Sequence, residues 1–283
     1  MRKNKTNPIL TGVIGTPIGH SLSPVIHNYW IEKYGENGIY IPLEVSRTHF
    51  SDVIKILPKM GFVGVNITIP HKEAALMCAD LVADNAALLG AANTLSLRKN
   101  GKIYANNTDG YGFLQNLKET EPTWRAVTGP ALVLGAGGGS RAIIYTLLRE
   151  GVPKVYLTNR TIERAKLLQN DLGNRVKVIE YVDLGAVLNE VTIIVNTTSL
   201  GMIGQPEMKF PYDSLNYRTI VYDIVYNPLR TDFLKQAEIR GCRTVEGLGM
   251  LLHQAANSYQ FWFGKLPEVT LELKNLVTEK LKA

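Results

Sequence analysis

A cluster of four glycines within residues 135–139 constrains this chain more than any other feature. It follows Ala131 to Leu134, a short apolar run typical of a buried parallel strand. Apolar residues then recur at helical spacing as far as Gly151, and a second apolar run covers residues 155–158. A strand, a glycine turn, a helix and a strand in this order are typical of the βαβ unit that binds dinucleotides.

The glycine loop predicts a site for a pyrophosphate. Backbone N–H groups at the positive end of a helix attract phosphates, and side chains in the loop would hold them away. The position of the fingerprint's third glycine is taken by Ser140, which is small enough for close helix–strand packing. An ordinary glycine-rich turn is the alternative, but the strand–helix–strand context favours a dinucleotide site. The expected cofactor-binding loop residues are Gly135, Ala136, Gly137, Gly138 and Gly139.

The end of the second strand distinguishes NADP from NAD. An NAD site usually places a carboxylate there to bind the ribose hydroxyls. This chain has Asn159, Arg160, Thr161 and Arg164, with no acidic residue before Glu163. Guanidinium groups bind phosphate oxygens in pairs, so we expect NADP, although the two arginines could also form a solvated helix face.

Length, charge and cysteine content exclude several classes of protein. The 283 residues suffice for one large or two medium domains, and the net charge of +6 comes from dispersed Lys and Arg, so no nucleic-acid surface is expected. No apolar run is long enough for a membrane helix, and the basic N-terminus lacks the apolar region of a signal peptide. Cys78 and Cys242 suggest neither a disulfide framework nor a zinc site, so a cytoplasmic location is expected.

Strand and helix patterns alternate along the chain, which predicts an α/β protein of two domains. Residues 1–109 are expected to form the first domain, which includes a strand pair around the Asn100-Gly101 turn. Residues 110–249 are expected to form the Rossmann-type domain. Residues 250–283 begin with an apolar helical stripe and should return to the first domain, with an active-site cleft between the two domains.

Several polar residues could carry chemistry. Ser23, just before Pro24, is expected to cap a helix, and with Ser21 it would form a cradle for a carboxylate. Lys72 lies in the first turn of a helix, where the helix dipole disfavours a cation, so it is either an ordinary solvated lysine or a residue with a role in proton transfer. Asp109 begins another helix as an N-cap or as a partner for such a lysine.

Polar side chains also interrupt apolar patterns, and buried amides need hydrogen-bond partners. Each such residue, taken alone, is explained by a structural role, whereas several of them at the ends of strands are typical of a pocket for a polyol. They are Asn66, Thr68, Asn93 and Gln254. The five histidines show no metal-ligand spacing and are expected to be surface residues or core residues with satisfied hydrogen bonds, so no metal site is expected.

Many separate motifs together resemble the shikimate dehydrogenase family over nearly the whole chain. The motifs in the first half are SLSP at 21–24, NITIPHK at 66–72, GAANTL at 90–95 and NTDG at 107–110. Those in the second half are GAGGGSRA at 135–142, NRTIER at 159–164, NTTSLGM at 196–202, DIVYNP at 223–228 and EGLGMLLHQA at 246–255.

This resemblance implies an NADP-dependent oxidoreductase that interconverts 3-dehydroshikimate and shikimate in aromatic amino acid and chorismate biosynthesis. It implies Lys72 and Asp109 as catalytic residues, and it places Ile224 and Gly247 near the nicotinamide, with Asp84 a weaker candidate on the cofactor side. The residues implied to contact shikimate are Ser21, Ser23, Thr68, Lys72, Asn93, Asp109, Tyr226 and Gln254.

Two alternatives stay open. One is a quinate/shikimate dehydrogenase that accepts NAD, against which Arg160 and Arg164 argue. The other is a non-catalytic dinucleotide-binding protein, which would not need Lys72 or Asp109. A monomer and a homodimer are both compatible with the sequence.

Overall fold

The computed structural model describes residues 7–282 and divides them into two compact units. The basic segment at residues 1–6 lies outside the described part. Unit 1 contains the described residues up to Thr108 and those from Gln254 onward, and unit 2 is Asp109–His253. The first division lies one residue before the boundary expected at 109/110, and the second lies four residues after the boundary expected at 249/250.

Unit 1 is built on a mixed sheet of six strands in the order β2-β1-β3-β5-β6-β4. β3 pairs antiparallel with β5 and β5 with β6, which confirms the expected strand pair around Asn100-Gly101, while the other pairs are parallel. The strands are β1 (Ile9–Gly15), β2 (Gly38–Glu44), β3 (Phe62–Ile67), β4 (Leu81–Val82), β5 (Thr94–Leu97) and β6 (Ile103–Asn106).

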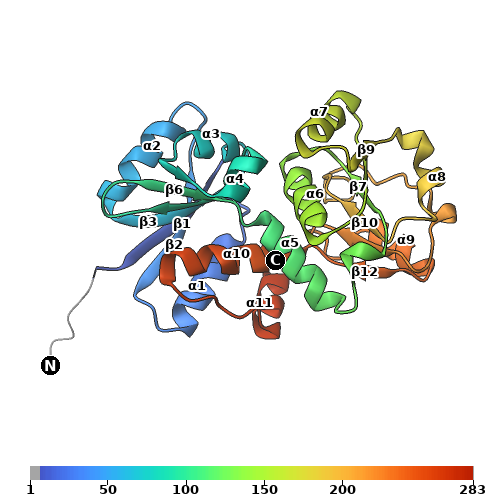
Figure 1. Ribbon diagram of the computed structural model, residues 1–283. Helices are drawn as coiled ribbons and strands as arrows, with labels where there is room; N and C mark the ends of the chain where they lie inside the picture. Colours follow the sequence, from blue (N-terminus) through green and yellow to red (C-terminus); the bar gives the residue numbers. More distant parts are fainter. Residues whose placement is uncertain (1–6, 283) are drawn as a thin grey trace. The chain divides into compact units, whose positions relative to one another are not determined.

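Helices cover both faces of this sheet (Figure 1). On one face, Phe50 and Ile54 of α2 and Ala75 of α3 join the buried core with the strands. On the other face, Trp262 near the end of α10 donates its indole N–H to the carbonyl of Leu95 at 3.1 Å. The helices of unit 1 are α1 (Ser23–Lys33), α2 (Phe50–Ile56), α3 (Lys72–Met77), α4 (Asp84–Leu89), the second half of α10 (Leu248–Phe263) and α11 (Leu271–Lys282), with a short 3-10 helix at Leu57–Met60.

Two local predictions for unit 1 are wrong. The N-cap of α1 is Leu22, and Ser23 is already the first helical residue, because the backbone N–H of Ser23 bonds to the Ser21 hydroxyl at 3.3 Å. His27 is fully buried, yet within residues 7–282 neither of its ring nitrogens has a hydrogen-bond partner. Its ring instead stacks on Tyr40 with centroids 4.1 Å apart, and burial lowers the pKa of His27 to about 3.

Unit 2 is built on a wholly parallel sheet in the order β12-β11-β10-β7-β8-β9. Starting from β7, this is the strand order of a Rossmann-type dinucleotide-binding domain, with the reversal of direction between β7 and β10. The strands are β7 (Ala131–Leu134), β8 (Val155–Thr158), β9 (Val176–Val178), β10 (Ile193–Asn196), β11 (Ile220–Asp223) and β12 (Arg243–Val245). The bounds of β7 and β8 are those expected from the sequence.

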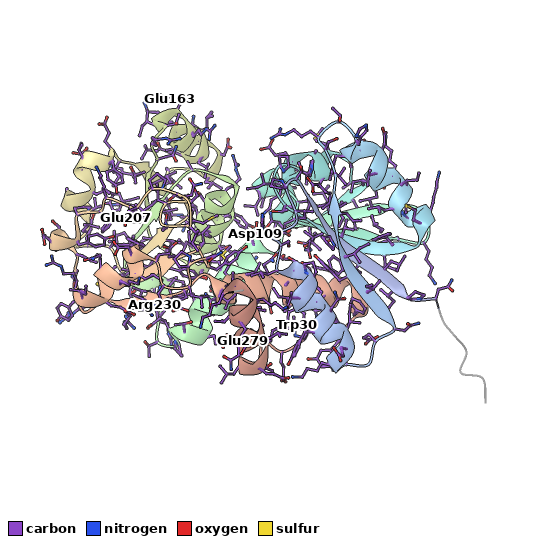
Figure 2. The ribbon with its side chains drawn as sticks, turned by 180° about the vertical axis from the view of Figure 1, so that it is seen from behind. Trp30, Asp109, Glu163, Glu207, Arg230 and Glu279 are labelled. Atoms are coloured by element: carbon purple, nitrogen blue, oxygen red, sulfur yellow. The ribbon has the colours of Figure 1, made fainter. Side chains whose placement is uncertain are left out.

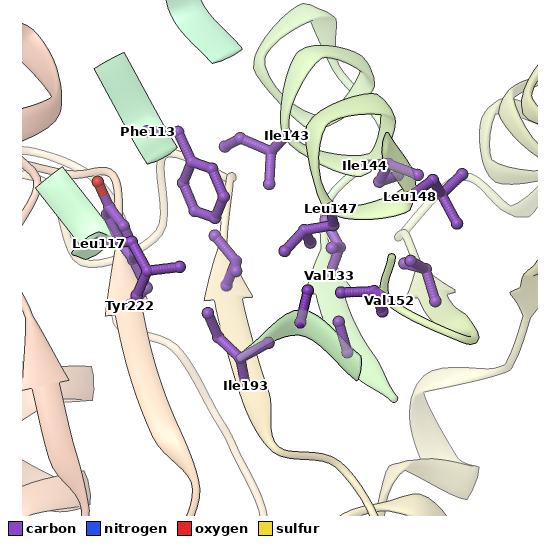
Figure 3. Close-up of a cluster of buried hydrophobic side chains, with 14 of the residues drawn as sticks. Phe113, Leu117, Val133, Ile143, Ile144, Leu147, Leu148, Val152, Ile193 and Tyr222 are labelled. Carbon is purple, nitrogen blue, oxygen red and sulfur yellow. The ribbon is translucent and has the colours of Figure 1, made fainter. Parts of the chain in front are cut away.

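Alternate side chains along β7 serve two cores. Val133 packs with α5, α6 and α7 on one face, where Phe113, Ile143 and Leu147 meet the strands (Figure 3). Leu134 packs on the other face with α8 and α9. The helices of unit 2 are α5 (Asp109–Thr120), α6 (Gly138–Glu150), α7 (Ile162–Leu172), α8 (Leu184–Val187), α9 (Asp232–Ile239) and the first half of α10, with short 3-10 helices at Ala126–Thr128, Tyr181–Asp183 and Tyr212–Ser214.

Two features are absent from residues 7–282: a helix that could span a membrane and a group of side chains that could hold a metal ion. None of the helices described between residues 7 and 282 is both long and apolar enough to cross a membrane. Over the same residues, no group of three or more His, Cys, Asp or Glu side chains could hold a metal ion.

Candidate active site

The polar residues of unit 1 gather at the carboxyl ends of β1 and β3. The N–H of Thr68, just after β3, bonds to the carbonyl of Ile14 at 2.9 Å, so this residue lies against the end of β1. β1 continues into the loop that carries Ser21 and Ser23. Ligands of open α/β sheets bind at such strand ends, so the predicted carboxylate cradle and Thr68 belong to one edge of unit 1.

Lys72 is held at the same edge through its backbone. It is the first residue of α3, and its carbonyl accepts a hydrogen bond from the N–H of Ala92 at 2.9 Å. Asn93 follows directly and accepts at its own carbonyl from the N–H of Ile67 at 2.8 Å. The structure therefore brings Lys72 and Asn93 together, although 20 residues separate them in the chain.

The start of α3 is further anchored by His71. This imidazole is buried, stacks on Phe50 with ring centroids 4.5 Å apart, and hydrogen-bonds through Nε2 to the carbonyl of Val45 at 2.7 Å. Since a carbonyl only accepts, Nε2 carries the proton. The contact fixes the backbone from which the Lys72 side chain extends.

A buried hydrogen-bond network contains Asn93 and Gln254. The Asn93 side-chain amide donates to Gln254 Oε1 at 3.2 Å and accepts from the N–H of Thr108 at 2.8 Å. Asp109 follows Thr108, begins α5 (Figure 2), and is itself buried. The network also includes Asn66, Thr94 and Ser258.

Unit 2 presents the glycine loop at the carboxyl end of β7. Gly135 has φ +107, and a Cβ there would lie 2.8 Å from Thr197 Oγ1, so the fold itself requires glycine. Gly137 and Gly138 are exposed, and a Cβ at either would meet no protein atom within 4 Å. Packing therefore does not explain these two glycines, whereas a phosphate lying against the backbone does, so the loop fits a dinucleotide.

Side chains from other strand ends fix the shape of this loop. Asn159, after β8, accepts from the N–H of Ala136 at 3.0 Å, so this N–H is engaged within the protein. Ser140, in the third glycine position, is fully buried and accepts from the N–H of Gly137 at 3.0 Å. The predicted close packing at Ser140 is present, with a hydroxyl that stabilises the turn.

The arginines expected at a 2′-phosphate lie in the segment that follows β8. Arg160 and Arg164 are both exposed, Arg160 before α7 and Arg164 in its first turn. Thr161 is the N-cap of α7, without a side-chain capping bond. Exposed guanidiniums at this strand end are available to an anionic group.

The remaining predicted residues follow β11 and β12. A Cβ on Gly247 would lie 2.4 Å from the carbonyl of Ile224, so glycine is required for the two segments to approach each other. Ile224 and Tyr226 are half-buried, and burial raises the pKa of the Tyr226 hydroxyl.

The buried carboxylate of Asp223, at the end of β11, holds this region together. It accepts from Asn196 Nδ2 at 2.9 Å, the N–H of Val225 at 3.0 Å and the Thr231 hydroxyl at 2.7 Å. Burial raises the pKa of Asp223 to about 6, against the lowering effect of these hydrogen bonds. Sequence reasoning identified the DIVYNP motif but assigned no role to Asp223; an acidic residue that ends an apolar run was the available signal.

Comparisons with known proteins identify the family. Family models match residues 13–95 as a shikimate dehydrogenase substrate binding domain, 123–209 as shikimate/quinate 5-dehydrogenase and 247–271 as a shikimate 5'-dehydrogenase C-terminal domain. A curated shikimate dehydrogenase (NADP(+)) of Cereibacter sphaeroides is 53% identical over 95% of this chain and 96% of its own length. The chain belongs to the shikimate dehydrogenase family.

Other members of the shikimate dehydrogenase family and related structures extend the comparison. The enzyme of Roseobacter denitrificans with the same description is 54% identical over 92% of this chain and 94% of its own. Shikimate 5-dehydrogenase of Thermus thermophilus, solved with NADP(H) and shikimate, has a TM-score of 0.85 at 33% identity and covers 97% of this chain and 98% of its own. Quinate dehydrogenase of Corynebacterium glutamicum, solved with NAD, has a TM-score of 0.89 at 28% identity and covers 98% and 100%.

Proposed function

We propose that this chain is an NADP-dependent shikimate dehydrogenase that reversibly reduces 3-dehydroshikimate to shikimate. One observation carries the proposal: the same chain contains both halves of such a site. Unit 1 has a hydrogen-bonded network of amides and hydroxyls beside Lys72, and unit 2 has a glycine loop in which Gly137 and Gly138 are open to a ligand. The two curated relatives described above, both more than 50% identical, carry this activity in their names.

Unit 1 supplies the residues for the substrate in this proposal. Ser21 and Ser23 bind its carboxylate, and Thr68, Asn93 and Gln254 bind its hydroxyls. Their support is that they lie on one edge of the sheet, with Asn93 and Gln254 hydrogen-bonded to each other. Tyr226 is the substrate residue that comes from unit 2.

Lys72 and Asp109 carry the proton transfer in this proposal. In the direction of reduction, the Lys72 ammonium gives a proton to the oxygen of the former ketone. In the direction of oxidation, the same amine takes the proton from the hydroxyl. The Asp109 carboxylate holds the Lys72 side chain in position for this transfer and stabilises the charge of the ammonium. Such a positioned proton donor typically contributes a factor of about 10²–10⁴ to the rate.

Unit 2 supplies the residues for the cofactor. Gly135 to Gly139 would hold the pyrophosphate, while Arg160, Arg164, Asn159 and Thr161 would hold the 2′-phosphate end, and Ile224 and Gly247 would lie near the nicotinamide. NADPH, when bound, supplies the hydride. In this proposal residues 1–109 with 250–283 form the substrate-binding domain and residues 110–249 the NADP-binding domain.

The cellular setting is part of the same proposal. We place the enzyme in the cytoplasm, as a monomer or homodimer with a small-molecule substrate and no nucleic-acid partner. Cys78 and Cys242 are both free thiols, which suits a reducing compartment. Light scattering on the purified protein measures the oligomeric state.

An absorbance assay at the NADPH band tests the function. Shikimate and quinate are each supplied with NADP and with NAD, and turnover should be fastest with shikimate and NADP. Faster turnover with quinate and NAD would favour the activity named for the Corynebacterium glutamicum structure. No turnover with any of the four pairs would favour a non-catalytic dinucleotide-binding protein.

A further inference from the structure

The buried network in unit 1 determines which way the Asn93 amide faces. A backbone N–H can only donate, so the N–H of Thr108, at 2.8 Å, identifies the facing atom as Asn93 Oδ1. The Thr94 hydroxyl donates to the same oxygen at 2.9 Å. The Asn93 amino group therefore faces the opposite way, toward the Thr108 hydroxyl and the Gln254 side chain.

The orientation of Asn93 determines that of Gln254. Because Asn93 Nδ2 donates, the atom of Gln254 that faces it at 3.2 Å is the carbonyl oxygen Oε1. Gln254 then keeps its Nε2 group as a donor for a ligand. Gln254 thus recognises a substrate hydroxyl by donating to its oxygen, which leaves the proton of that hydroxyl for transfer.

Ser258 lies beside Thr94, the residue whose hydroxyl donates to Asn93 Oδ1. It is fully buried and lies one helical turn after Gln254 in α10, with its hydroxyl oxygen 3.1 Å from the main-chain carbonyl oxygen of Gln254. Its oxygen accepts from Asn66 Nδ2 at 2.9 Å and lies 2.8 Å from the Thr94 oxygen. Because the Thr94 proton goes to Asn93 Oδ1, Ser258 is the donor in its contact with Thr94. One hydroxyl therefore contacts the helix that carries Gln254 and the threonine that bonds to Asn93.

We infer that Ser258 is a positioning residue for substrate recognition, which through Thr94 fixes the Asn93 amide in the orientation that leaves Gln254 Nε2 as a donor. The inference rests on the proposed function. It requires no contact between Ser258 and the substrate, because a side chain that orients a ligand-binding group acts through that group. Space filling is the alternative role for Ser258.

Ser258→Ala is a clean test because it leaves no buried donor without an acceptor. Asn66 Nδ2 still has the Asn93 carbonyl and the Thr94 hydroxyl, each at 3.1 Å. The KM for shikimate should rise about 3- to 10-fold, the worth of one intramolecular hydrogen bond, while kcat and the KM for NADP stay within about twofold. The preference for shikimate over an analogue that lacks one ring hydroxyl should fall by a similar factor.

Thr278→Val is the matched control. Thr278 likewise lies one helical turn after the residue whose carbonyl it faces, with its hydroxyl oxygen 2.8 Å from the carbonyl oxygen of Lys274, but it does so on α11. This variant should keep the wild-type KM and the wild-type preference among substrates. A space-filling role for Ser258 would lower only the melting temperature and the fraction of active enzyme.

Thr94→Val is the second variant, and it decides the matter if Ser258→Ala does not fold. It removes the hydroxyl that donates to Asn93 Oδ1, and the same rise in KM is expected. If the wild-type enzyme oxidises shikimate but the variants keep its KM and its substrate preference, the inference about Ser258 is overturned and the proposed function is not. A wild-type protein without shikimate turnover would instead overturn the proposed function.

Discussion

The two units use their polar groups in opposite ways. In unit 1 the predicted ligand-binding groups include neutral side chains, such as Asn93, that are buried and hydrogen-bonded to one another. In unit 2 Gly137 and Gly138 are exposed, with no protein atom within 4 Å of an added Cβ, and the buried Asp223 carboxylate stabilises loops.

This difference reflects two kinds of ligand. A ring with several hydroxyls differs from its analogues in hydrogen-bonding geometry, and fixed side chains can detect such differences. A pyrophosphate is a common anionic group that backbone N–H groups and a helix N-terminus bind. Unit 1 should therefore be sensitive to changes of side-chain chemistry, and unit 2 to a single added methyl group.

Lys72→Ala should produce the largest effect and tests whether unit 1 acts through its side chains. Loss of a positioned proton donor should lower kcat by about 10²–10⁴, with the melting temperature unchanged. Steady-state kinetics with shikimate and NADP measure the effect, and Lys59→Ala, an exposed lysine of the same unit, is the control. An unchanged kcat would remove Lys72 from the mechanism.

Asp223→Asn tests whether the buried carboxylate of unit 2 is structural. Its folded-state pKa of about 6 lies above the ordinary value of 3.8, so the folded state holds the proton more tightly than the unfolded chain. Between these values the unfolded chain binds fewer protons, and the stability of the wild type falls as pH rises. Relative to the variant, the wild-type free energy of unfolding should decrease by about 2.4 kcal/mol from pH 4 to pH 7.

Urea unfolding across that pH range measures this difference. Asp213→Asn is the control, because Asp213 is an exposed carboxylate of the same unit that pairs with Arg240. The control curve should run parallel to that of the wild type. If the Asp223→Asn curve also ran parallel to it, the buried carboxyl would not have a raised pKa.

Arg160→Gln tests the cofactor assignment of unit 2. Loss of a charged hydrogen bond to the 2′-phosphate should weaken NADPH binding by about 1.5–3 kcal/mol and leave NADH binding unchanged. Calorimetric titration with each nucleotide measures this, with Lys166→Gln as a control on the exposed surface of α7. Equal weakening of both nucleotides would show that Arg160 does not bind the 2′-phosphate.

Gly138→Ala should have the smallest effect on stability, and its two effects should have opposite signs. Alanine favours a helix over glycine, so the free energy of unfolding should rise by about 0.5 kcal/mol, since no protein atom lies near the added Cβ. NADPH affinity should fall about tenfold, or about 1.4 kcal/mol, because the methyl group occupies the space of a phosphate. Gly185→Ala in α8 is the control, and unchanged NADPH affinity for Gly138→Ala would contradict the loop assignment.

Local patterns were sufficient for much of the fold. The bounds of β7 and β8 follow from short apolar runs, and Gly151 ends α6 in the left-handed conformation expected of a helix-terminating glycine. The capping prediction at Ser23 failed because the helix begins at Ser23 itself, with Leu22 as the N-cap, and only the path of the loop determines where the first turn starts.

The site was predictable by residue type and not by geometry. Asn93 and Gln254 were identifiable as amides inside apolar patterns, but Ser258 looked like an ordinary residue of a buried stripe. Its role becomes visible only when α10 packs beside β3 and β5, which places its hydroxyl next to Asn66 and Thr94. Similarly, His27 satisfies the pattern of a core residue, and only the structure shows that its imidazole is surrounded by aromatic rings.

The sequence by itself determined the family, the βαβ unit, the glycine loop and the residue types available for catalysis, because each depends on neighbours within one strand or helix. Tertiary structure decided the strand order of both sheets, the direction of the Asn93 amide and the raised pKa of Asp223. Those properties depend on burial and on hydrogen bonds between distant segments, which no local pattern encodes.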